Sequence, residues 1–288
     1  MKILQEIIDY KKAYANIVNT SVKYIKDNGI KSLVLGISGG IDSTLVALIA
    51  RDVCDETGIK LIGRNIPIKP KMFCESEAII GWESNYTAIS LGKDLCDDFE
   101  VTDLSPEFNI LWETIKDPEP HETLTDYKIR RGNVMARMRM ICLYDLAQKN
   151  RGMVLSTDNL TEYFLGFWTL HGDVGDYGMV QQLWKTEVYK MTEWLYETKY
   201  KSLCVGVDIM DSIGRNPTDG LGISNGDLEQ LEADSYEEVD NILKEYLKID
   251  NPIYNGERCH QLSVIRRHLR SRHKRLNPIN IEREKILK

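Results

Sequence analysis

The sequence predicts an α/β fold in which helices flank a mostly parallel sheet. Short runs of consecutive apolar residues, such as residues 33–37, have the composition of strands that are buried on both faces. These runs alternate along the chain with longer segments of helical periodicity, an order typical of parallel sheets covered by helices. Neither an internal repeat nor a low-complexity tract divides the 288 residues. We therefore expect a single domain over residues 1–288, with helical additions at its N- and C-terminal ends.

The first part of the chain is expected to form three helices and three strands. An amphipathic helix is predicted over residues 3–28, because apolar residues recur at helical spacing and Asn28-Gly29 supplies a stop signal. The elements that follow are a strand at 33–37, a helix at 43–58, a strand at 59–68, a helix at 75–96 and a strand at 98–104. Each strand is a short run rich in apolar residues, whereas each helix is long enough to cover a sheet.

The second part continues the same alternation after a polar connection. Residues 116–126 carry two prolines and form the best loop candidate in the chain. A long helix is predicted at 128–150, and the strand "GMVLS" follows at 152–156. A glycine-rich acidic loop at 172–178 and a turn-rich segment at 216–225 come next, and we expect the C-terminal region to be helical.

Composition and charge exclude several classes of protein. The formal net charge of −7 argues against a surface built as a whole for nucleic acid, because such binding depends on Lys and Arg that neutralise phosphates. The N-terminal segment carries charges every few residues, so neither a signal peptide nor a membrane span is expected. The six cysteines form no CxxC pair, which favours reduced thiols. We therefore expect a cytoplasmic protein that binds neither nucleic acid nor a membrane.

The segment "LGISGGIDST" at residues 35–44 joins the first strand to a helix and has the composition of a phosphate-binding loop. Its glycines allow backbone N–H groups to approach phosphate oxygens, and the helix N-terminus adds a favourable partial positive charge. The usual phosphate loop carries a lysine for the terminal phosphates, whereas this segment carries Asp42.

Asp42 indicates that a metal ion takes part in phosphate binding. A carboxylate about 4 Å from a phosphate charge is repelled by roughly 4 kcal/mol at an effective dielectric constant near 20. A divalent cation between the two removes this cost, and Mg²⁺ is typically bound by one or two carboxylates together with substrate phosphates. The loop therefore favours a site for Mg²⁺ and pyrophosphate. The alternative interpretation is that Asp42 caps the following helix.

Five motifs resemble a known family. "SGGIDS" at 38–43 matches the SGGxDS loop of the ATP pyrophosphatases, whose fold is of the Rossmann-like adenine nucleotide alpha hydrolase type. "GNVMARMRM" at 132–140, "STDNLTEYFLGFWTLHGD" at 156–173, "NPTDGL" at 216–221 and "RHKR" at 272–275 are similar to motifs of the NAD synthetases, in the same order. The resemblance extends from about residue 33 to residue 278.

The resemblance implies ATP-dependent amidation of deamido-NAD (nicotinate adenine dinucleotide) to NAD. The nicotinate carboxylate is adenylated with release of pyrophosphate, and ammonia then expels AMP. Only about 30 residues precede the first strand, too few for the glutaminase domain of the glutamine-dependent members, and residue 2 is Lys rather than a nucleophilic Cys. We expect ammonia as the nitrogen donor, with a separate glutaminase subunit as the open alternative. The family also implies a homodimer.

The resemblance assigns an ATP and metal site residue by residue. The matching ATP-site positions are Gly36, Ile37, Ser38, Gly39, Gly40, Ile41, Asp42, Ser43, Thr157, Lys185 and Thr218. Asp42 and Lys185 are the expected catalytic residues, and Asp42 and Glu162 the expected Mg²⁺ ligands. Because both carboxylates follow predicted parallel strands, we expect them at the carboxyl edge of the sheet. Without the resemblance, Thr157 is a helix cap, Thr218 a turn residue, and Glu162 and Lys185 exposed helix residues.

The residues that match the deamido-NAD site are Arg137, Asp176, His273 and Lys274. Asp173 is an alternative to Asp176, because "GDVGDYG" aligns in two ways. This chain has Leu170 where many ammonia-dependent members have a lysine that contacts deamido-NAD, so His171 or another residue must replace that contact or it is lost. The basic run at 266–275 then supplies positive charge for the dinucleotide, although a solvated helix face is its other interpretation.

Two competing functions follow from the same residues. One is another adenylating ATP pyrophosphatase, such as a tRNA-modifying enzyme, although those often use a cysteine pair and the cysteines here are scattered. The other is a non-catalytic ATP-binding protein that keeps the loop. Formation of NAD, AMP and pyrophosphate distinguishes the main hypothesis from both.

Overall fold

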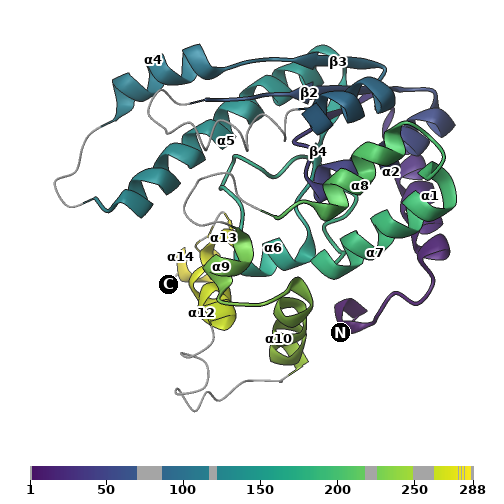
Figure 1. The fold of residues 1–288 in the computed structure, drawn as a ribbon. Coiled ribbons are helices and arrows are strands. Elements are labelled where there is room, and N and C mark those ends of the chain that lie inside the picture. Colours follow the sequence, from purple (N-terminus) through teal and green to yellow (C-terminus); the bar gives the residue numbers. More distant parts are fainter. Residues whose placement is uncertain are drawn as a thin grey trace.

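The sheet of the protein is entirely parallel over the residues that the structure describes. The structure, a computed structural model, describes residues 2–69, 86–116, 122–217, 226–248, 263–277, 279, 281 and 283–286. The strands are β1 (Ser32–Gly36), β2 (Lys60–Asn65), β3 (Asp98–Val101), β4 (Gly152–Ser156) and β5 (Tyr177–Gly178). They lie in the order β3-β2-β1-β4-β5, and each neighbouring pair is parallel (Figure 1). The predicted α/β fold is confirmed.

The strand order reverses beside β1, and this reversal positions the site. β1 pairs with β2 on one side and with β4 on the other, so that Ser32 lies opposite both Lys60 and Gly152. The chain therefore winds outward from β1 in one direction and later returns to its other side. The loops after β1 and β4 diverge to opposite faces at such a point, and they leave a crevice at the carboxyl ends of the strands.

Helices cover both faces of the sheet. α1 (Tyr10–Asn28), α2 (Ile41–Thr57), α7 (Lys185–Leu195) and α8 (Val205–Gly214) share one core with Leu33 and Leu35 of β1. Val34, between these two leucines, packs instead with Met140 and Leu143 of α5 (Leu124–Lys149). α4 (Ser105–Ile115) packs beside α5. Alternate residues of one strand thus enter opposite layers, which explains why the run at 33–37 is apolar throughout.

The C-terminal region adds a second helical cluster below the sheet in the view of Figure 1. In this cluster, α9 (Asp227–Leu231), α10 (Tyr236–Lys248) and α12 (Ser263–Arg270) pack with the earlier helix α6 (Leu160–Leu165). α13 (Arg272–Arg275) and α14 (Arg283–Ile286) follow α12 in the chain. Phe164 of α6 and Trp184, the residue before α7, meet Val239 and Leu243 of α10 in one buried cluster. The C-terminal helices therefore pack against the two segments that follow β4.

Several predicted boundaries differ from the structure. The predicted N-terminal helix at 3–28 is wrong at its start: a short 3-10 turn (Lys2–Leu4) comes first, and α1 begins at Tyr10 because Asp9 caps it by accepting a bond from the Lys12 N–H (2.9 Å). α4 was not expected, and α5 begins at Leu124, inside the predicted loop, where Thr123 caps it. Residues 86–95 of the predicted 75–96 helix are helical, and residues 75–85 lie outside the described residues.

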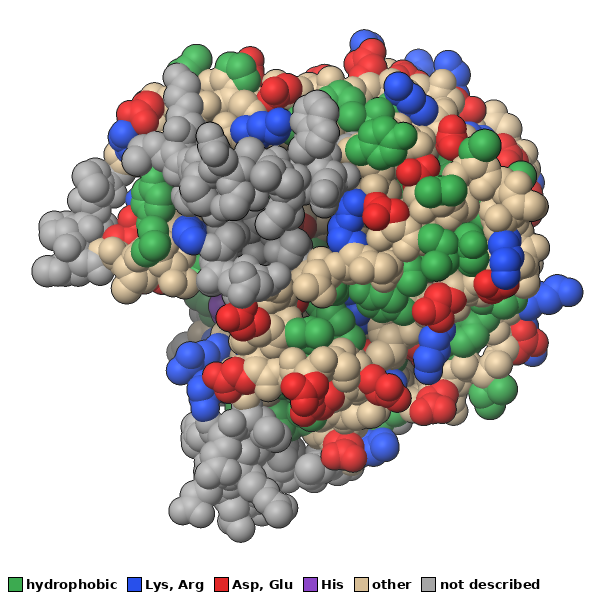
Figure 2. All heavy atoms as spheres, in the orientation of Figure 1, with side chains coloured by type: hydrophobic (Ala, Val, Ile, Leu, Met, Phe, Trp, Pro, Cys, Tyr) green, Lys and Arg blue, Asp and Glu red, His purple; other side chains and the backbone are tan. Residues whose placement is uncertain are grey.

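Other boundaries differ by a few residues: β2 ends at Asn65 and β3 at Val101, before the predicted 68 and 104, and the predicted loop at 172–178 contains the short strand β5. α1 and α2 end at Gly29 and Gly58, both left-handed C-caps, and β4 has the predicted bounds. Acidic and basic side chains are interspersed over the described surface in Figure 2. Across the described ranges, none of the helices combines the length and the apolar character needed to span a membrane. The four described cysteines, Cys54, Cys96, Cys142 and Cys204, are free thiols.

Gly152→Ala is expected to destabilise the protein, because β1 and β4 approach closely at this position. An added Cβ would lie 2.6 Å from the Ser32 carbonyl oxygen and closer still to its hydroxyl. Backbone cannot move aside without disturbing the β1–β4 pairing, so we expect a loss of about 1–3 kcal/mol in urea unfolding. Gly214→Ala is the control, because its added Cβ meets nothing within 4 Å. Equal stability of the two variants would contradict this close approach.

Candidate active site at the switch point of the sheet

The loop after β1 wraps over the N-terminus of α2. Gly39 has a φ of 81°, in the left-handed region that favours glycine, and Gly40 is the N-cap of α2. The Ser43 hydroxyl donates to the Gly40 carbonyl (3.0 Å), and the Gly40 N–H donates to Ser38 Oγ (3.2 Å). These local bonds hold the loop in shape at the start of a 17-residue helix, a position suited to binding an anion.

Asp42 does not cap α2, so the capping interpretation is wrong. The N-cap is Gly40, which makes no side-chain cap bond, and Asp42 lies in the first helical turn. Its Oδ1 accepts a hydrogen bond from Asn159 Nδ2 (2.8 Å), a residue that follows β4. Asp42 therefore faces across the crevice toward the neighbouring strand end.

The segment after β4 brings Glu162 to the same crevice. Asn159 caps α6 through a reciprocal capping box: its side chain accepts from the Glu162 N–H, and the Glu162 carboxylate accepts from the Asn159 N–H. Asn159 thus holds Glu162 through the backbone and Asp42 through its side-chain amide. Thr157 is not the helix cap that its alternative interpretation required, and it lies half-buried between β4 and α6.

Lys185 joins the two carboxylates. It is the first residue of α7, and its Nζ lies 2.5 Å from Asp42 Oδ2 and 3.1 Å from Glu162 Oε1. Only 3% of the Lys185 side chain is exposed, against 18% for each carboxylate. Lys185 is therefore not an exposed helix residue: it lies between two acids that come from distant parts of the chain.

The charges of these three groups depend on one another. Burial opposes the charge of Lys185, but the carboxylates of Asp42 and Glu162 outweigh it and raise the pKa of the ammonium well above its ordinary value. Burial raises the pKa of Glu162, the ammonium of Lys185 partly offsets this rise, and Asp42 adds to it. The raised pKa of Glu162 means that one ammonium does not fully stabilise both carboxylates in their charged form, so a further cation between them would favour the charged form of Glu162.

The donor set fits the expected Mg²⁺. Asp42 and Glu162 offer carboxylate oxygens from opposite sides of the crevice, and hard oxygen ligands are those that Mg²⁺ prefers. Within the described ranges, His, Cys, Asp and Glu side chains form no cluster of three or more that could hold a metal. Two carboxylates completed by phosphate oxygens and water is the usual pattern for Mg²⁺ at a nucleotide site.

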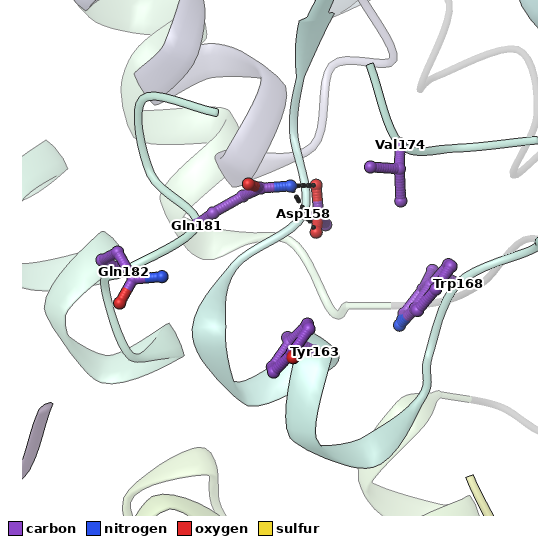
Figure 3. Close-up of a pocket in the computed structure, with 6 residues that line it drawn as sticks. All are labelled: Asp158, Tyr163, Trp168, Val174, Gln181 and Gln182. Carbon is purple, nitrogen blue, oxygen red and sulfur yellow. Dashed lines mark hydrogen bonds between the residues drawn. The ribbon is translucent and has the colours of Figure 1, made fainter. Parts of the chain in front are cut away.

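A pocket of about 220 Å³ is lined in part by neighbours of Asn159 and Glu162 in the chain (Figure 3). It is lined by Asp158, Tyr163, Trp168, Val174, Gln181 and Gln182. Asp158 and Tyr163 adjoin Asn159 and Glu162 in the chain, and Gln181 donates to both oxygens of the Asp158 carboxylate (2.8 and 3.0 Å). The Nε1 of Trp168 is buried without a hydrogen-bond partner in the described part of the chain. The pocket thus offers apolar walls and a few polar groups, as small-molecule sites do.

The residues expected to bind deamido-NAD occupy several places around the segment after α6. Arg137 is exposed on α5, and its Nε donates to the Leu170 carbonyl (3.1 Å). Lys274 donates to the carbonyls of Gly166 (2.7 Å) and Trp168, and His273 is exposed on α13. Thr218, expected at the ATP site, lies outside the described residues.

The two candidate aspartates are held differently. Asp176 accepts bonds from the Tyr144 hydroxyl (3.0 Å) and the Val154 N–H (3.1 Å), which fasten its loop to α5 and β4. Asp173 accepts from the Thr169 N–H (2.6 Å). Burial raises the pKa of Asp173, and positive charge on Lys274 counts among the effects that lower it. The choice of Asp176 as the substrate ligand stays a prediction.

Sequence reasoning missed three residues that contact the site. Asn159 had a signal, because Asn three positions before Glu at the start of an apolar run is a capping pattern. Tyr236 and Asp240 had none, because they approach Lys185 from a helix about 50 residues further along the chain. Only the packing of α10 against α7 shows their relation to the site.

A doubly wound parallel sheet, with a glycine loop, two carboxylates and a lysine at its switch point, defines an ATP-binding enzyme of the ATP pyrophosphatase type. The model of the NAD synthase family matches residues 13–278. The chain therefore belongs to the NAD synthase family. It is an ATP-dependent ligase of NAD biosynthesis that forms a carbon–nitrogen bond.

The chain is similar to NAD(+) synthetases named for ammonia and to others named for glutamine. It is 31% identical over 244 residues to the "NH(3)-dependent NAD(+) synthetase" of Mycoplasmopsis pulmonis, covering 84% of this chain and 82% of that protein. It is 30% identical over 231 residues to the "Glutamine-dependent NAD(+) synthetase" of Thermotoga maritima, covering 78% of this chain and 36% of that protein. The solved NMN synthetase of Francisella tularensis has a TM-score of 0.71 at 22% identity, covering 93% of this chain and 97% of that one.

Lys185→Met is expected to destabilise the folded protein in the absence of metal, because it leaves Asp42 and Glu162 facing each other without a cation. Removing one partner of a buried ion pair lowers the free energy of unfolding by about 3 kcal/mol. The raised pKa of Glu162 determines how the free energy of unfolding changes with pH. The folded state keeps a proton on Glu162 that the unfolded state loses above pH 4.5, so stability falls as the pH rises.

The measurement is urea unfolding with a chelator present, at pH 5 and pH 8. Lys201→Met is the matched control, because Lys201 pairs with Glu197 on the exposed surface away from the crevice. A variant at Lys185 that is as stable as the control at pH 8 would show that the ammonium does not hold the two carboxylates together.

Proposed function

We propose that the enzyme amidates the nicotinate carboxylate of deamido-NAD with free ammonia, through an acyl adenylate. The single observation that carries the proposal is the meeting of Asp42, Glu162 and Lys185 beside the glycine loop at the switch point. A phosphate-binding loop next to two metal-binding carboxylates and a lysine is suited to ATP chemistry at the α-phosphate. Membership of the NAD synthase family supports the substrate.

The reaction proceeds in two steps. A carboxylate oxygen of the substrate attacks the α-phosphorus of ATP, the bond to the bridging oxygen breaks, and pyrophosphate leaves with the electron pair. The carbonyl carbon now carries AMP as a good leaving group. Ammonia attacks that carbon, loses a proton, and expels AMP to leave the amide.

Several groups of the proposed ATP site neutralise the charge of the phosphates. Backbone N–H groups of residues 36–43 and the N-terminus of α2 bind phosphate oxygens, with Thr157 at the edge of the site. The family motif also assigns Thr218 to ATP, and this residue lies outside the described ranges. Asp42 and Glu162 hold Mg²⁺, which neutralises phosphate charge when it is bound. Lys185 contacts the departing pyrophosphate with its ammonium. The positive charge already buried there needs no additional desolvation when ATP arrives.

The substrate side is formed by the pocket and the basic C-terminal segment. Arg137, Asp176, His273 and Lys274 contact deamido-NAD, and the pocket beside Glu162 receives the end of the dinucleotide that reacts. Its aromatic walls, Tyr163 and Trp168, suit a flat pyridine ring. Asp42 and Glu162 would hold Mg²⁺ at the neighbouring carboxylate pair, where it would supply positive charge to the phosphates of ATP. Two copies of the chain form the active homodimer.

Amidation of nicotinate mononucleotide is the second candidate function. Leu170 takes the place of a lysine that contacts deamido-NAD in many ammonia-dependent members, so the contact with the dinucleotide is changed in this chain. A structure similar to this chain is that of an NMN synthetase. A mononucleotide lacks the adenosine half and therefore requires fewer contacts outside the pocket.

The deciding experiment incubates the protein with Mg²⁺-ATP, ammonium and either deamido-NAD or nicotinate mononucleotide. We expect NAD, AMP and pyrophosphate in equal amounts from deamido-NAD, with a higher kcat/KM than for the mononucleotide. The opposite order of kcat/KM would support the second candidate. Absence of amide product from both substrates would reject the proposal. Replacing ammonium by glutamine tests the nitrogen source, and we expect little product.

Asp42→Asn is expected to lower kcat by about 10²–10³-fold, because the amide keeps the size of the side chain and removes the charge that holds the metal. Asp55→Asn is the control: Asp55 is an exposed acid near the other end of α2, paired with Arg51. Steady-state kinetics with saturating Mg²⁺-ATP and deamido-NAD measure both. Unchanged kcat in Asp42→Asn would show that this carboxylate does not hold the metal.

A further inference from the structure

Helix α10 contacts Lys185 through two side chains one helical turn apart. Tyr236 and Asp240 are four residues apart, so they lie on the same face of the helix, and both are buried. The ring of Tyr236 lies 5.4 Å from Lys185 Nζ, and Asp240 binds the backbone beside Lys185. One turn of a distant helix thus contacts both the ammonium and the main chain of a residue in the ATP site.

Asp240 holds the N-terminus of α7. Its Oδ2 accepts from the Thr186 N–H (3.0 Å) and from the Thr186 hydroxyl (2.7 Å), and only 1% of the residue is exposed. The N-cap residue of α7, Trp184, has no oxygen or other acceptor in its side chain to offer these N–H groups. The Asp240 carboxylate therefore caps α7 from another helix, and its negative charge is favourable at the positive end of the helix dipole.

The second oxygen of Asp240 binds the start of α6. Oδ1 accepts from the Thr161 hydroxyl (2.5 Å), and Thr161 Oγ1 in turn accepts from the Lys185 N–H (2.8 Å). Because the hydroxyl proton is directed to Asp240, the oxygen is left to accept from Lys185. Thr161 directly precedes Glu162 in α6. Asp240 therefore orders the backbone of Lys185 and of the segment that carries Glu162.

Tyr236 restricts the ammonium itself. Its ring face is close enough to Nζ for a cation–π contact, and its hydroxyl donates to Asp227 of α9 (3.0 Å). The ring is therefore fixed by a second contact while it covers the side of Lys185 that faces α10. The main chain of Lys185 is fixed by Asp240, and the free motion of its side chain is limited by Tyr236.

We propose that Asp240 is a positioning residue of the ATP site, which sets the approach of Lys185 to the phosphates by anchoring the start of α7 through Thr186 and Thr161. The inference rests on the proposed role of Lys185 in ATP binding. It assigns a task to α10, which carries none of the residues that the family motifs single out. The C-terminal helical cluster is thereby part of the ATP site rather than a separate addition to the fold.

A purely structural role for Asp240 is the alternative, because any buried and hydrogen-bonded carboxylate stabilises the fold. The two roles differ in what they change. Loss of stability alone lowers the unfolding midpoint and leaves the affinity of the folded protein for ATP intact. Loss of positioning weakens the contact of Lys185 with ATP, and it does so only while Lys185 is present.

The test is a double-mutant cycle on the affinity for Mg²⁺-ATP, measured by calorimetry on the full chain without the second substrate. The variants are Asp240→Ala, Lys185→Met and the pair of both, with Asp240→Asn as a milder replacement that can keep part of the bonding. We expect Asp240→Ala to raise the Kd for Mg²⁺-ATP about 10-fold in the native background. In the Lys185→Met background it should raise the Kd less than 2-fold, because groups that act through one another are not additive.

Asp208→Asn is the matched control. Asp208, on α8, is also a buried carboxylate, and it accepts a hydrogen bond from the Ser90 hydroxyl (2.7 Å). We expect it to lower the unfolding midpoint with no change in the Kd for Mg²⁺-ATP. Steady-state kinetics should show that Asp240→Asn raises the KM for ATP and lowers kcat while the KM for deamido-NAD is kept. If Asp240→Ala does not stay folded, Asp240→Asn and Thr186→Ala replace it in the cycle.

Two results would overturn the inference: an unchanged Kd in all Asp240 and Thr186 variants that fold, or the same loss of affinity with and without Lys185. Neither result touches the proposed reaction, which the formation of NAD tests separately. If Lys185→Met alone left the Kd unchanged, the proposed role of Lys185 would fail and the inference with it, while NAD formation would still decide the reaction.

Discussion

The buried ammonium of Lys185 between Asp42 and Glu162 is the interaction on which the site depends. Each of the three residues comes from a different segment: the helix after β1, the helix after β4 and the start of α7. None of the charges is tolerable alone in this crevice, because an unpaired buried charge is strongly unfavourable. The pairing therefore holds three chain segments in one arrangement and keeps at the sheet edge the charges that phosphate chemistry requires.

This pairing also explains the extra helices of the C-terminal region. A lysine at the first position of a helix is normally solvated, so its burial requires other elements to cover it and to satisfy the backbone around it. α10 does both, through the Tyr236 ring and the Asp240 carboxylate. α6 and α12 complete the same cluster around Phe164 and Trp184. The helical cluster and the proposed ATP site are therefore one structural unit.

Much of the fold could be predicted because its signals are local. The apolar run of β1, the glycine stops at Gly29 and Gly58, and the strand at 152–156 each depend on a few neighbouring residues. The start of α1 was missed although its signal is local: Asp9 caps the helix, but apolar residues before it continue the helical spacing toward the N-terminus. The loop prediction at 116–126 was wrong at its end for a similar reason: Thr123 is an effective cap inside a polar stretch.

The sequence by itself determined the chemistry: the glycine loop, the acid within it, and a second acid after another strand, which had to meet at one edge because parallel strands end together. The tertiary structure decided how these groups are held. It showed that Lys185 lies between the acids, that Asn159 connects them, and that Asp240 anchors the backbone beside Lys185. The contacts of Lys185 with the two acids, of Asn159 with Asp42 and of Asp240 with Thr186 join residues from 23 to 143 positions apart. They depend on the packing of whole helices, for which no short stretch of sequence carries a signal.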